Sequence, residues 1–422
     1  MSFQRLRGFK DIYGSEADEC ARVEALARKV FGAFGFKEIR TPVLETRDLF
    51  RRALGSDTDV VQKEMYEFED RSKEHIAMRP EGTAGVVRAY LENNFDKTEG
   101  LSKFFYTGSM FRSERPQAGR LRQFHQIGVE QLGTSSPYAD AETIQCLVLF
   151  LDTCGAHDFE IKLNNLGTFE ERKVFKETLK NYFKPREKEL CDDCKSRLER
   201  NVFRILDCKS ELCRRIIIKS PPIHDFLNDE SKNHYRQVCE GLAGTGIRFK
   251  EDPYMIRGLD YYTKTVFEIS HPKLGAQDAL AAGGRYDSLI ESFGGAPAGA
   301  VGFAIGVERL LMCLPEAGNE KTAGENTFFV ATLGETAFKE GFRLLSQLRA
   351  AGMKVLMDFS ARSLKGQLRF ADKEKCRYVI ILGDDEIKKN SFILKDMKNS
   401  AQKEIALSGA LEALKKEEKE HA

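Results

Sequence analysis

The chain has 422 residues, enough for two or three domains with cores of their own, and its 66 Lys and Arg nearly balance its 65 Asp and Glu. The net charge of +1 excludes a positive field over the whole molecule, so any contact with nucleic acid must come from local patches. The ten cysteines follow no regular framework, the start lacks an apolar stretch of signal-peptide length and no run reaches the length of a membrane helix, so we expect a protein of the reducing cytoplasm without membrane contact.

The first predicted element is a helix over residues 16–34, because apolar side chains recur there at helical spacing until Gly35 stops the pattern. A short strand is predicted over Phe36 to Ile39, before Pro42. These residues alone do not distinguish a helix in an ordinary core from a helix at a subunit interface.

The segment MRPEGTAGVVRAYL, Met78 to Leu91, predicts a loop that ends in a helix. Pro80 and Gly82 break regular structure, and Thr83 is expected to cap the helix that follows. The carboxylate of Glu81 is a natural partner for the ammonium group of a ligand. Alternatively, it serves only the positive end of the helix, through the macrodipole.

The run FYTGSMFRSERPQAGRLRQFHQIGVE, Phe105 to Glu130, predicts two strands around an arginine-rich loop. Alternation gives each strand one polar face, which ends in Arg112 on the first strand and carries Gln126 and Glu130 on the second. A buried cation, amide and carboxylate are costly unless something pairs with them, so a shared face predicts a site for a polar ligand that bears phosphate. The alternative is a surface hairpin with solvated charges.

Residues 165–246 differ in character, being helical and highly charged, and we expect them to be an insertion. They contain CDDC, Cys191 to Cys194, and two further cysteines, Cys208 and Cys213. Two such pairs can form a tetrahedral thiolate zinc site. Because four residues separate the second pair, reduced buried thiols are the preferred interpretation, and no metal ligand is assigned.

Two later stretches have unusual polar content. RGLDYYTKTVFEI, Arg257 to Ile269, places an arginine and the pair Tyr261 and Tyr262 at the entrance of an alternating strand. Within AAGGRYD, Ala281 to Asp287, the residues from Gly283 to Asp287 predict a turn before another helix, and this turn contains Tyr286. These tyrosines either line a site or are core residues with satisfied hydroxyl groups.

The stretch AVGFAIGVERL, Ala300 to Leu310, is predicted to be helical ahead of Arg309. Gly302 and Gly306 stand four residues apart there, so their bare backbone would let a flat base or a phosphate approach. Tighter packing of the helix explains the same glycines equally well.

From Phe328 onward, strands alternate with helices, which predicts a parallel-rich sheet flanked by helices. The expected strands are 328–332, 354–358 and 378–382, and the expected helices are 335–351 and 363–375. The gap from Pro315 to Asn326, with two glycines and several charges, is the expected linker.

Together, these motifs resemble the histidyl-tRNA synthetases of the bacterial type, which are class II aminoacyl-tRNA synthetases, over essentially the whole chain. FRSERP and AVGFAIGVERL match the second and third motifs of the class, and RGLDYYTKTVFEI and AAGGRYD match two stretches peculiar to the histidine enzymes. The resemblance implies an α+β catalytic domain with a mainly antiparallel sheet over residues 1–320, interrupted by a helical insertion at about 165–246. It also implies a C-terminal α/β domain over 327–422 that binds the anticodon, and a homodimer formed through the first motif, residues 16–42.

The implied reaction is the ATP-dependent activation of L-histidine to histidyl-adenylate, followed by transfer of histidine to the 3′ end of tRNA(His). ATP is a substrate and comes with Mg²⁺, and no tightly bound organic cofactor is expected. By resemblance, the catalytic and ATP-binding residues are Arg112, Arg257 and Arg309. The histidine-binding residues are Glu81, Gly82, Thr83, Arg112, Gln126, Glu130, Arg257, Tyr261, Tyr262 and Tyr286. The residues at the acceptor end of the tRNA are Arg115, Gln117 and Arg120.

Within the histidine group, the resemblance assigns Glu81 to the α-amino group, and Glu130 and Tyr262 to the two imidazole nitrogens. Two other interpretations account for the sequence less well. A catalytically silent paralogue, the regulatory subunit of histidine biosynthesis, typically lacks the C-terminal tail and loses the arginines, and both are present here. Synthetases for threonine or proline do not account for the two stretches peculiar to the histidine enzymes.

Overall fold

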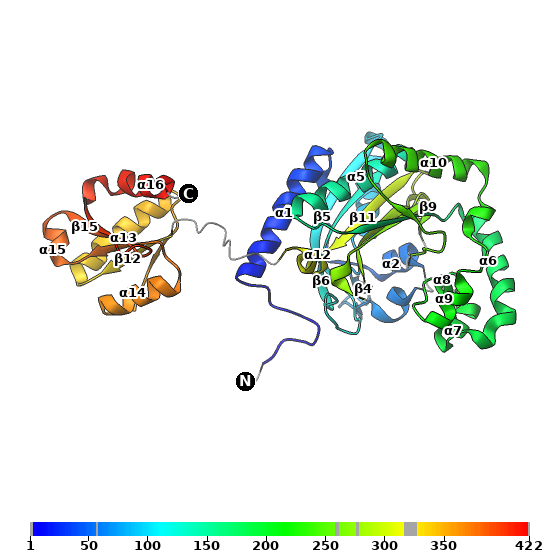
Figure 1. Cartoon of the computed structure of the whole chain (residues 1–422), viewed down its shortest axis with the longest axis horizontal. Coiled ribbons are helices and arrows are strands. Elements are labelled where there is room, and N and C mark those ends of the chain that lie inside the picture. Colours follow the sequence, from blue (N-terminus) through cyan, green and yellow to red (C-terminus); the bar gives the residue numbers. More distant parts are fainter. Residues whose placement is uncertain are drawn as a thin grey trace. The chain divides into compact units, whose positions relative to one another are not determined.

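The computed structural model describes residues 3–55, 58–257, 261–275, 278–315, 327–360 and 362–420. The chain divides into two compact units, Met1–Pro315 and Glu316–Ala422, and Figure 1 labels the main elements of each. The expected linker lies outside the described residues, apart from Pro315. Helices within the described ranges fall short of the length and apolar character that crossing a membrane requires.

The first unit is built on an eight-stranded sheet. In spatial order its strands are β1 (Lys37–Glu38), β5 (Ser102–Phe111), β6 (Gln123–Leu132), β11 (Ala300–Gly306), β10 (Ala279–Arg285), β9 (Thr263–Ser270), β7 (Glu160–Asn165) and β8 (Lys250–Glu251). Neighbouring strands run antiparallel except at the two edges, where β1 pairs with β5 and β8 with β7 in parallel. The expectation of a mainly antiparallel sheet is confirmed.

Side-chain alternation gives this sheet two faces with separate cores. Odd-numbered positions such as Ile127, Val129 and Phe303 are buried under a layer formed by α1 (Ser15–Ala33), α5 (Pro137–Cys154), α10 (Asp229–Gly244) and α12 (Val307–Cys313). Even-numbered positions such as Tyr106 and Val266 belong to a second core with α2 (Arg47–Leu54) and α3 (Thr83–Glu92). The polar face predicted for the hairpin lies on this second side.

Smaller elements complete the first unit. A three-stranded antiparallel sheet has the order β2 (Leu44–Thr46), β4 (His75–Met78) and β3 (Glu67–Glu69). It lies before α3 in the chain, so it leads directly into the loop that carries Glu81. Two short helices, α4 (Phe95–Thr98) and α11 (Ser288–Ser292), precede β5 and β11 respectively.

The segment after β7 is helical, as predicted. It contains α6 (Phe169–Phe183), α7 (Asp192–Arg200), α8 (Phe203–Leu206) and α9 (Glu211–Ile217), before α10. A capping box begins α6, in which Thr168 and Glu171 each accept the backbone N–H of the other, at 3.3 and 2.6 Å. Residues of α6 to α9 share the core of the even-numbered face, whereas α10 packs beside α5 in the other core. The helical insertion is confirmed, and its exact boundaries stay a prediction.

The second unit is a five-stranded sheet flanked by helices. Its strands, in spatial order, are β13 (Val355–Met357), β12 (Phe328–Thr332), β14 (Tyr378–Leu382), β15 (Ser391–Asp396) and β16 (Gln402–Ala406). The first three are parallel and the last two antiparallel. Its helices are α13 (Glu335–Ala350), α14 (Leu364–Lys373), α15 (Asp384–Lys388) and α16 (Ala410–Glu420). The predicted alternation of strands and helices is confirmed.

One local prediction is wrong. Gly302 and Gly306 lie on strand β11, not on a helix, and α12 begins only at Val307. The physical reason is tertiary pairing: Gly302 stands opposite Glu130 of β6 on one side and Gly284 of β10 on the other. A spacing of four is even, so on a strand it also puts both glycines on one face.

A second correction concerns the start of α3. Thr83 is its first residue and not its cap, because the N-cap position is held by Gly82 without a side-chain bond. The carboxylate of Glu81 takes over the capping, since it accepts the backbone N–H groups of Thr83 and Ala84 at 2.7 and 2.9 Å. The hydroxyl group of Thr83 is thereby left for a different partner.

Candidate active site

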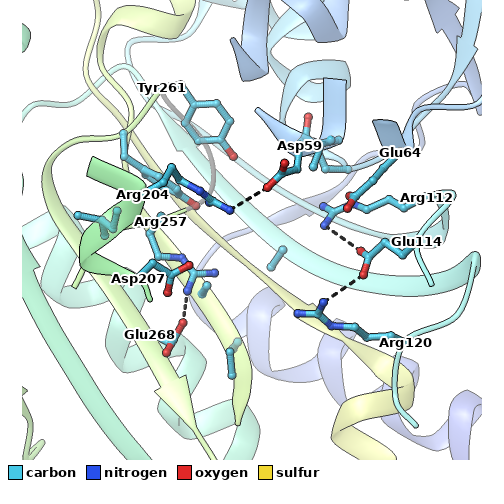
Figure 2. A pocket seen from close by; sticks show the side chains of 18 of the residues that line it. Asp59, Glu64, Arg112, Glu114, Arg120, Arg204, Asp207, Arg257, Tyr261 and Glu268 are labelled. Carbon is cyan, nitrogen blue, oxygen red and sulfur yellow. Dashed lines mark hydrogen bonds and ion pairs between the residues drawn. The ribbon is translucent and has the colours of Figure 1, made fainter. Parts of the chain in front are cut away.

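A cavity of about 820 Å³ opens on the even-numbered face of the large sheet. Figure 2 labels charged and aromatic residues of its lining, which come from the hairpin, the strands, the insertion and the segment after α2. Residues assigned from sequence that line it are Glu81, Thr83, Arg112, Arg120, Gln126, Glu130, Arg257, Tyr261, Tyr262 and Tyr286. The side chains come from segments far apart in the sequence, and the fold brings them to one place.

One end of the cavity is organised around the carboxyl group of Glu130, which is 1% exposed. The hydroxyl of Thr83 donates to its Oε1 at 2.7 Å, and the hydroxyl of Tyr286 donates to its Oε2. Burial raises the pKa of Glu130 to about 8, although both hydrogen bonds favour the ionised form. A ligand that donates to this carboxyl group, or carries positive charge, is therefore favoured here.

A second buried carboxyl group, Glu81, lies at the same end, and Thr83 connects the two, since it donates a backbone N–H to Glu81 and its hydroxyl to Glu130. Burial raises the pKa of Glu81. Both interpretations given to Glu81 from the sequence have support: it caps α3 and it also lines the cavity. Within the part of the chain that the structure describes, neither carboxyl group is hydrogen-bonded to a cationic side chain, so the two together form a receptor for cationic groups.

Aromatic rings and an amide complete this end. The ring of Tyr261 contacts those of Tyr262 and Tyr286, with centroids 4.7 and 5.6 Å apart. Burial raises the pKa of Tyr262 to about 12, so its phenol keeps its proton at neutral pH. The Oε1 atom of Gln126 is buried and has no hydrogen-bond partner among the described residues. Such an orphaned acceptor fits a ligand that donates a hydrogen bond.

Glycines lie beside the groups that line this end, and one of them, Gly302, lines the cavity itself. A Cβ atom at Gly302 would lie 2.0 Å from Oε2 of Glu130, and one at Gly284 would lie 2.8 Å from Cδ1 of Tyr262. In the sheet, Gly284, Gly302 and Glu130 stand side by side on β10, β11 and β6. These positions therefore require glycine, because any larger residue would displace the groups that line the cavity. Gly82 is not among the lining residues, but it is packed against the ring of Tyr106 in the same way.

The other end of the cavity carries guanidinium groups. Glu114 lies between Arg112 and Arg120, with N–O distances of 3.8 and 3.2 Å, and Arg257 pairs with Glu268 of β9. Arg112 is oriented by its Nε, which donates to the carbonyl of Pro80 at 2.8 Å. Figure 2 shows the first group and the Arg257–Glu268 pair on opposite sides of the cavity. Planar cations that converge from two sides suit a bound polyphosphate.

Besides Gly82, three assigned residues lie outside the cavity lining. Arg309, on α12, stands beside the hairpin loop, where a Cβ atom at Gly119 would be 3.4 Å from its Cγ. Arg115 and Gln117 are exposed in that loop. The loop is a tight turn, closed by backbone bonds between Gln117 and Arg120 at 3.1 and 2.9 Å. Residues 258–260 of the RGLDYY stretch lie outside the described residues.

The insertion contributes residues that the sequence reasoning missed. Arg204, on α8, pairs with Asp59 at 3.1 Å, and Lys209 lies 3.7 Å from Asp278. All four line the cavity. No local signal in one sequence marks them, because each pair joins segments separated by more than 60 positions, and only the packing of the insertion brings them together.

Arg285 was also missed, and it acts behind the site. It is the last residue of β10, so the turn predicted over Gly283 to Asp287 is wrong for its first three residues, which pair with β9 and β11 as part of the sheet. It is fully buried and binds Asp140 of α5, Asp287 at 2.9 Å and the carbonyl of Thr134 at 2.8 Å. Because neighbouring strand residues face opposite sides, this network on the helix side fixes Tyr286 on the cavity side. Arg285 is thus a positioning residue for Tyr286.

The antiparallel sheet and the arginine-lined cavity on its face define a class II aminoacyl-tRNA synthetase. The family described as Histidyl-tRNA synthetase matches residues 8–180 and 221–310, and the Anticodon binding domain matches 327–417. Proteins named histidine–tRNA ligase from Desulfosudis oleivorans and Aquifex aeolicus are each 44% identical to this chain; the first match covers 97% of both chains, and the second covers 97% of this one and 100% of the other. The crystal structure of the apo histidyl-tRNA synthetase of S. aureus superimposes with a TM-score of 0.81 at 35% identity, covering 97% of this chain and 99% of that one. This chain belongs to the histidyl-tRNA synthetase family.

Proposed function

We propose that this protein is a histidine–tRNA ligase, which activates L-histidine with ATP to histidyl-adenylate and transfers histidine to the 3′ end of tRNA(His), releasing pyrophosphate and AMP. The observation that carries the proposal is a single cavity lined by two chemically distinct sets of groups, buried carboxyl and phenol groups in one set and guanidinium groups in the other. The first suits an amino acid with a hydrogen-bonding ring, and the second suits a triphosphate.

At the carboxyl end, Glu81 receives the α-amino group of histidine, while Glu130 and Tyr262 hold the two ring nitrogens. Gln126 assists nearby. The burial of these groups supports the assignment, because an amino acid without an imidazole would leave them unpaired. A site of this kind rejects analogues by roughly 10⁴-fold, so no editing activity is required.

At the guanidinium end, Arg112 and Arg257 stabilise the negative charge that develops as the histidine carboxylate attacks the α-phosphorus. Arg309 contacts ATP from beside the hairpin loop. Catalysis of this step consists mainly of positioning and of cations directed at phosphate oxygens. The carboxylates now paired with these arginines, Glu114 and Glu268, are exchanged for phosphate oxygens, and Mg²⁺ accompanies the nucleotide.

For the transfer step, Arg115, Gln117 and Arg120 of the hairpin loop meet the acceptor end of the tRNA. The exposure of the first two supports this assignment. Residues 327–422 form the unit that recognises the anticodon, in line with the match over 327–417. Lys365 and Arg369, one turn apart and both exposed on α14, are suited to contact backbone phosphates.

We also propose a homodimer that acts in the cytoplasm, with the first motif at its interface. Val43 and Leu44, which follow Pro42, are 39% and 45% exposed. Apolar side chains at this point suit a subunit contact. Sedimentation of the purified chain at the mass of a monomer would contradict the dimer.

The test of function is ATP–pyrophosphate exchange by the purified full-length chain, with the twenty amino acids offered singly. We expect exchange with histidine and none above background with the others. A regulatory paralogue would bind histidine in calorimetry yet give no exchange, and exchange with another amino acid would show that the selectivity is assigned wrongly. Arg257→Ala is the matched inactive control.

A further inference from the structure

We propose that Cys191, Cys194, Cys208 and Cys213 bind one zinc ion as four thiolates, and that this ion holds the wall that the insertion gives to the cavity. The sequence favoured reduced buried thiols without a metal. The arrangement of the four sulfur atoms changes that preference.

The four Sγ atoms all lie within 4.8 Å of one another, and those of Cys191 and Cys208 are 3.8 Å apart. A tetrahedral zinc site with Zn–S bonds of about 2.3 Å has sulfur–sulfur edges of roughly 3.8 Å. The sulfur atoms therefore already stand close to the corners of such a site. All four cysteines are free, so no disulfide explains why they converge.

The surroundings suit a structural ion. Cys194, Cys208 and Cys213 are buried and Cys191 is half-buried. Among the described residues, the cluster offers only sulfur ligands, which closes a tetrahedral site to substrate or water. The backbone N–H of Cys191 donates to Sγ of Cys213 at 3.3 Å, which is a bond that stabilises a thiolate.

Local structure answers the objection drawn from spacing. Cys191 stands at the N-cap of α7 and Cys194 in its first turn, so the first pair is held at a helix start. Cys213 lies in α9, which begins at Glu211 and turns the chain back toward Cys208. The four residues between the last two cysteines are therefore a turn into a helix, and they do not prevent a shared ligand.

The short helices of this segment would also gain stability from a bound ion. Helices α7, α8 and α9 are nine, four and seven residues long. Isolated helices of such lengths are marginal in water, and this segment is rich in charge. Metal binding would supply folding free energy to it directly, since the site exists only in the folded chain.

The same segment lines the cavity. Arg197, Arg204 and Lys209 lie between the cysteines in the sequence and are among the lining residues, and the last two pair with Asp59 and Asp278 across from them. An ion bound to the four sulfur atoms would fix the position of these cations. This consequence for catalysis rests on the proposed function, whereas the metal site does not.

The test begins with zinc content. Full-length chain from zinc-supplemented cells, dialysed extensively, should contain about one zinc per chain by atomic emission. Cys208→Ser should lose it, whereas Cys239→Ser, which removes a lone half-buried thiol on α10, should keep it. Wild-type protein stripped of zinc and titrated with Co²⁺ should show the strong visible bands of tetrahedral cobalt thiolate, which keeps the test valid if a variant fails to fold.

Wild-type protein with neither zinc nor those cobalt bands would overturn the proposal, as would undiminished zinc in Cys208→Ser.

Trypsin tests whether the ion holds this wall of the cavity in place, because Arg197, Arg200 and Arg204 are cleavage sites between the cysteines. Removing zinc should speed cleavage there at least tenfold and raise the KM for ATP. Equal cleavage with and without zinc would overturn that role. Zinc content requires no enzymatic activity, so failure of the proposed function would be recognised separately.

Discussion

Replacing Glu130 with alanine tests most directly whether histidine and ATP bind to separate groups of the cavity. The carboxyl group accepts the hydroxyl groups of Thr83 and Tyr286, and the proposed ring nitrogen of histidine would be a further donor. The matched control is Gln131→Ala. Gln131 is the next residue on β6, is also buried, and points to the opposite face, where Thr143 donates to it at 3.4 Å.

The expected magnitude follows from the bonds that are lost. When a bound imidazole ring holds the carboxyl group of Glu130 in its ionised form, the hydrogen bond between them contributes about 1.5–3 kcal/mol, which corresponds to roughly 10–150-fold in affinity for histidine. Two buried donors are left without an acceptor, which places the effect toward the upper end. The guanidinium groups that face ATP bond to other carboxylates, so the KM for ATP should change by less than about threefold.

The assay is pyrophosphate exchange, with histidine varied at saturating ATP and then ATP varied at saturating histidine. Glu130→Ala should raise the KM for histidine alone, and Gln131→Ala should leave both constants close to those of the wild type. An equal rise in the KM for histidine and the KM for ATP in Glu130→Ala would refute the assignment of Glu130 to the imidazole ring. A large rise in the KM for histidine in Gln131→Ala would show that any disturbance of β6 weakens histidine binding, whichever face of the strand it affects.

Four further outcomes are expected. Arg257→Ala should lower exchange by on the order of 10²–10³-fold with an unchanged circular dichroism spectrum, and near-normal exchange would contradict its role in charge stabilisation. A Cβ atom at Gly302 would meet Oε2 of Glu130 at 2.0 Å, so Gly302→Ala should destabilise the first unit by about 1–3 kcal/mol and raise the KM for histidine, whereas Gly32→Ala, with nothing within 4 Å, should do neither. Because burial raises the pKa of Glu130 from 4.5 to about 8, its contribution to stability is full below the lower value and is lost as pH rises to the upper one. Glu130→Gln should therefore gain in melting temperature over the wild type between about pH 5 and pH 8, and a constant difference would rule out the raised pKa. Removal of residues 327–422 should spare adenylate formation and impair charging, and undiminished charging would contradict the division of labour between the units.

Local pattern was sufficient where an element obeys one period along its whole length. The strands 328–332 and 378–382 were predicted with both ends correct, because a run of apolar residues bounded by polar ones leaves little choice. The hairpin also followed its pattern, since the register of β5 and β6 puts Tyr106 opposite Gly128 and so aligns the two polar faces. Alternation alone fixes such faces, once two strands are joined by a loop.

Predictions from local sequence pattern failed where contacts with other segments decide the structure. Glycine spacing in β11 fits a helix as well as a strand, and the strand forms because β6 and β10 pair with it from both sides. The cap of α3 was assigned to Thr83 because short polar residues usually cap, yet Glu81 reaches the same N–H groups and Thr83 instead donates to Glu130. Competition between acceptors from different segments cannot be read from one segment.

The sequence by itself determined the hairpin, the alternation of strands and helices after residue 327 and the residue types that meet at the site, because periodicity and motif spacing are properties of the chain. Only the tertiary structure decided how Arg204 and Lys209 of the insertion line the same cavity as Arg112, and how four cysteines converge within 4.8 Å. The physical reason is that alternation and helical spacing act over a few residues, whereas burial, ion pairing and metal coordination depend on distances between segments that only packing sets.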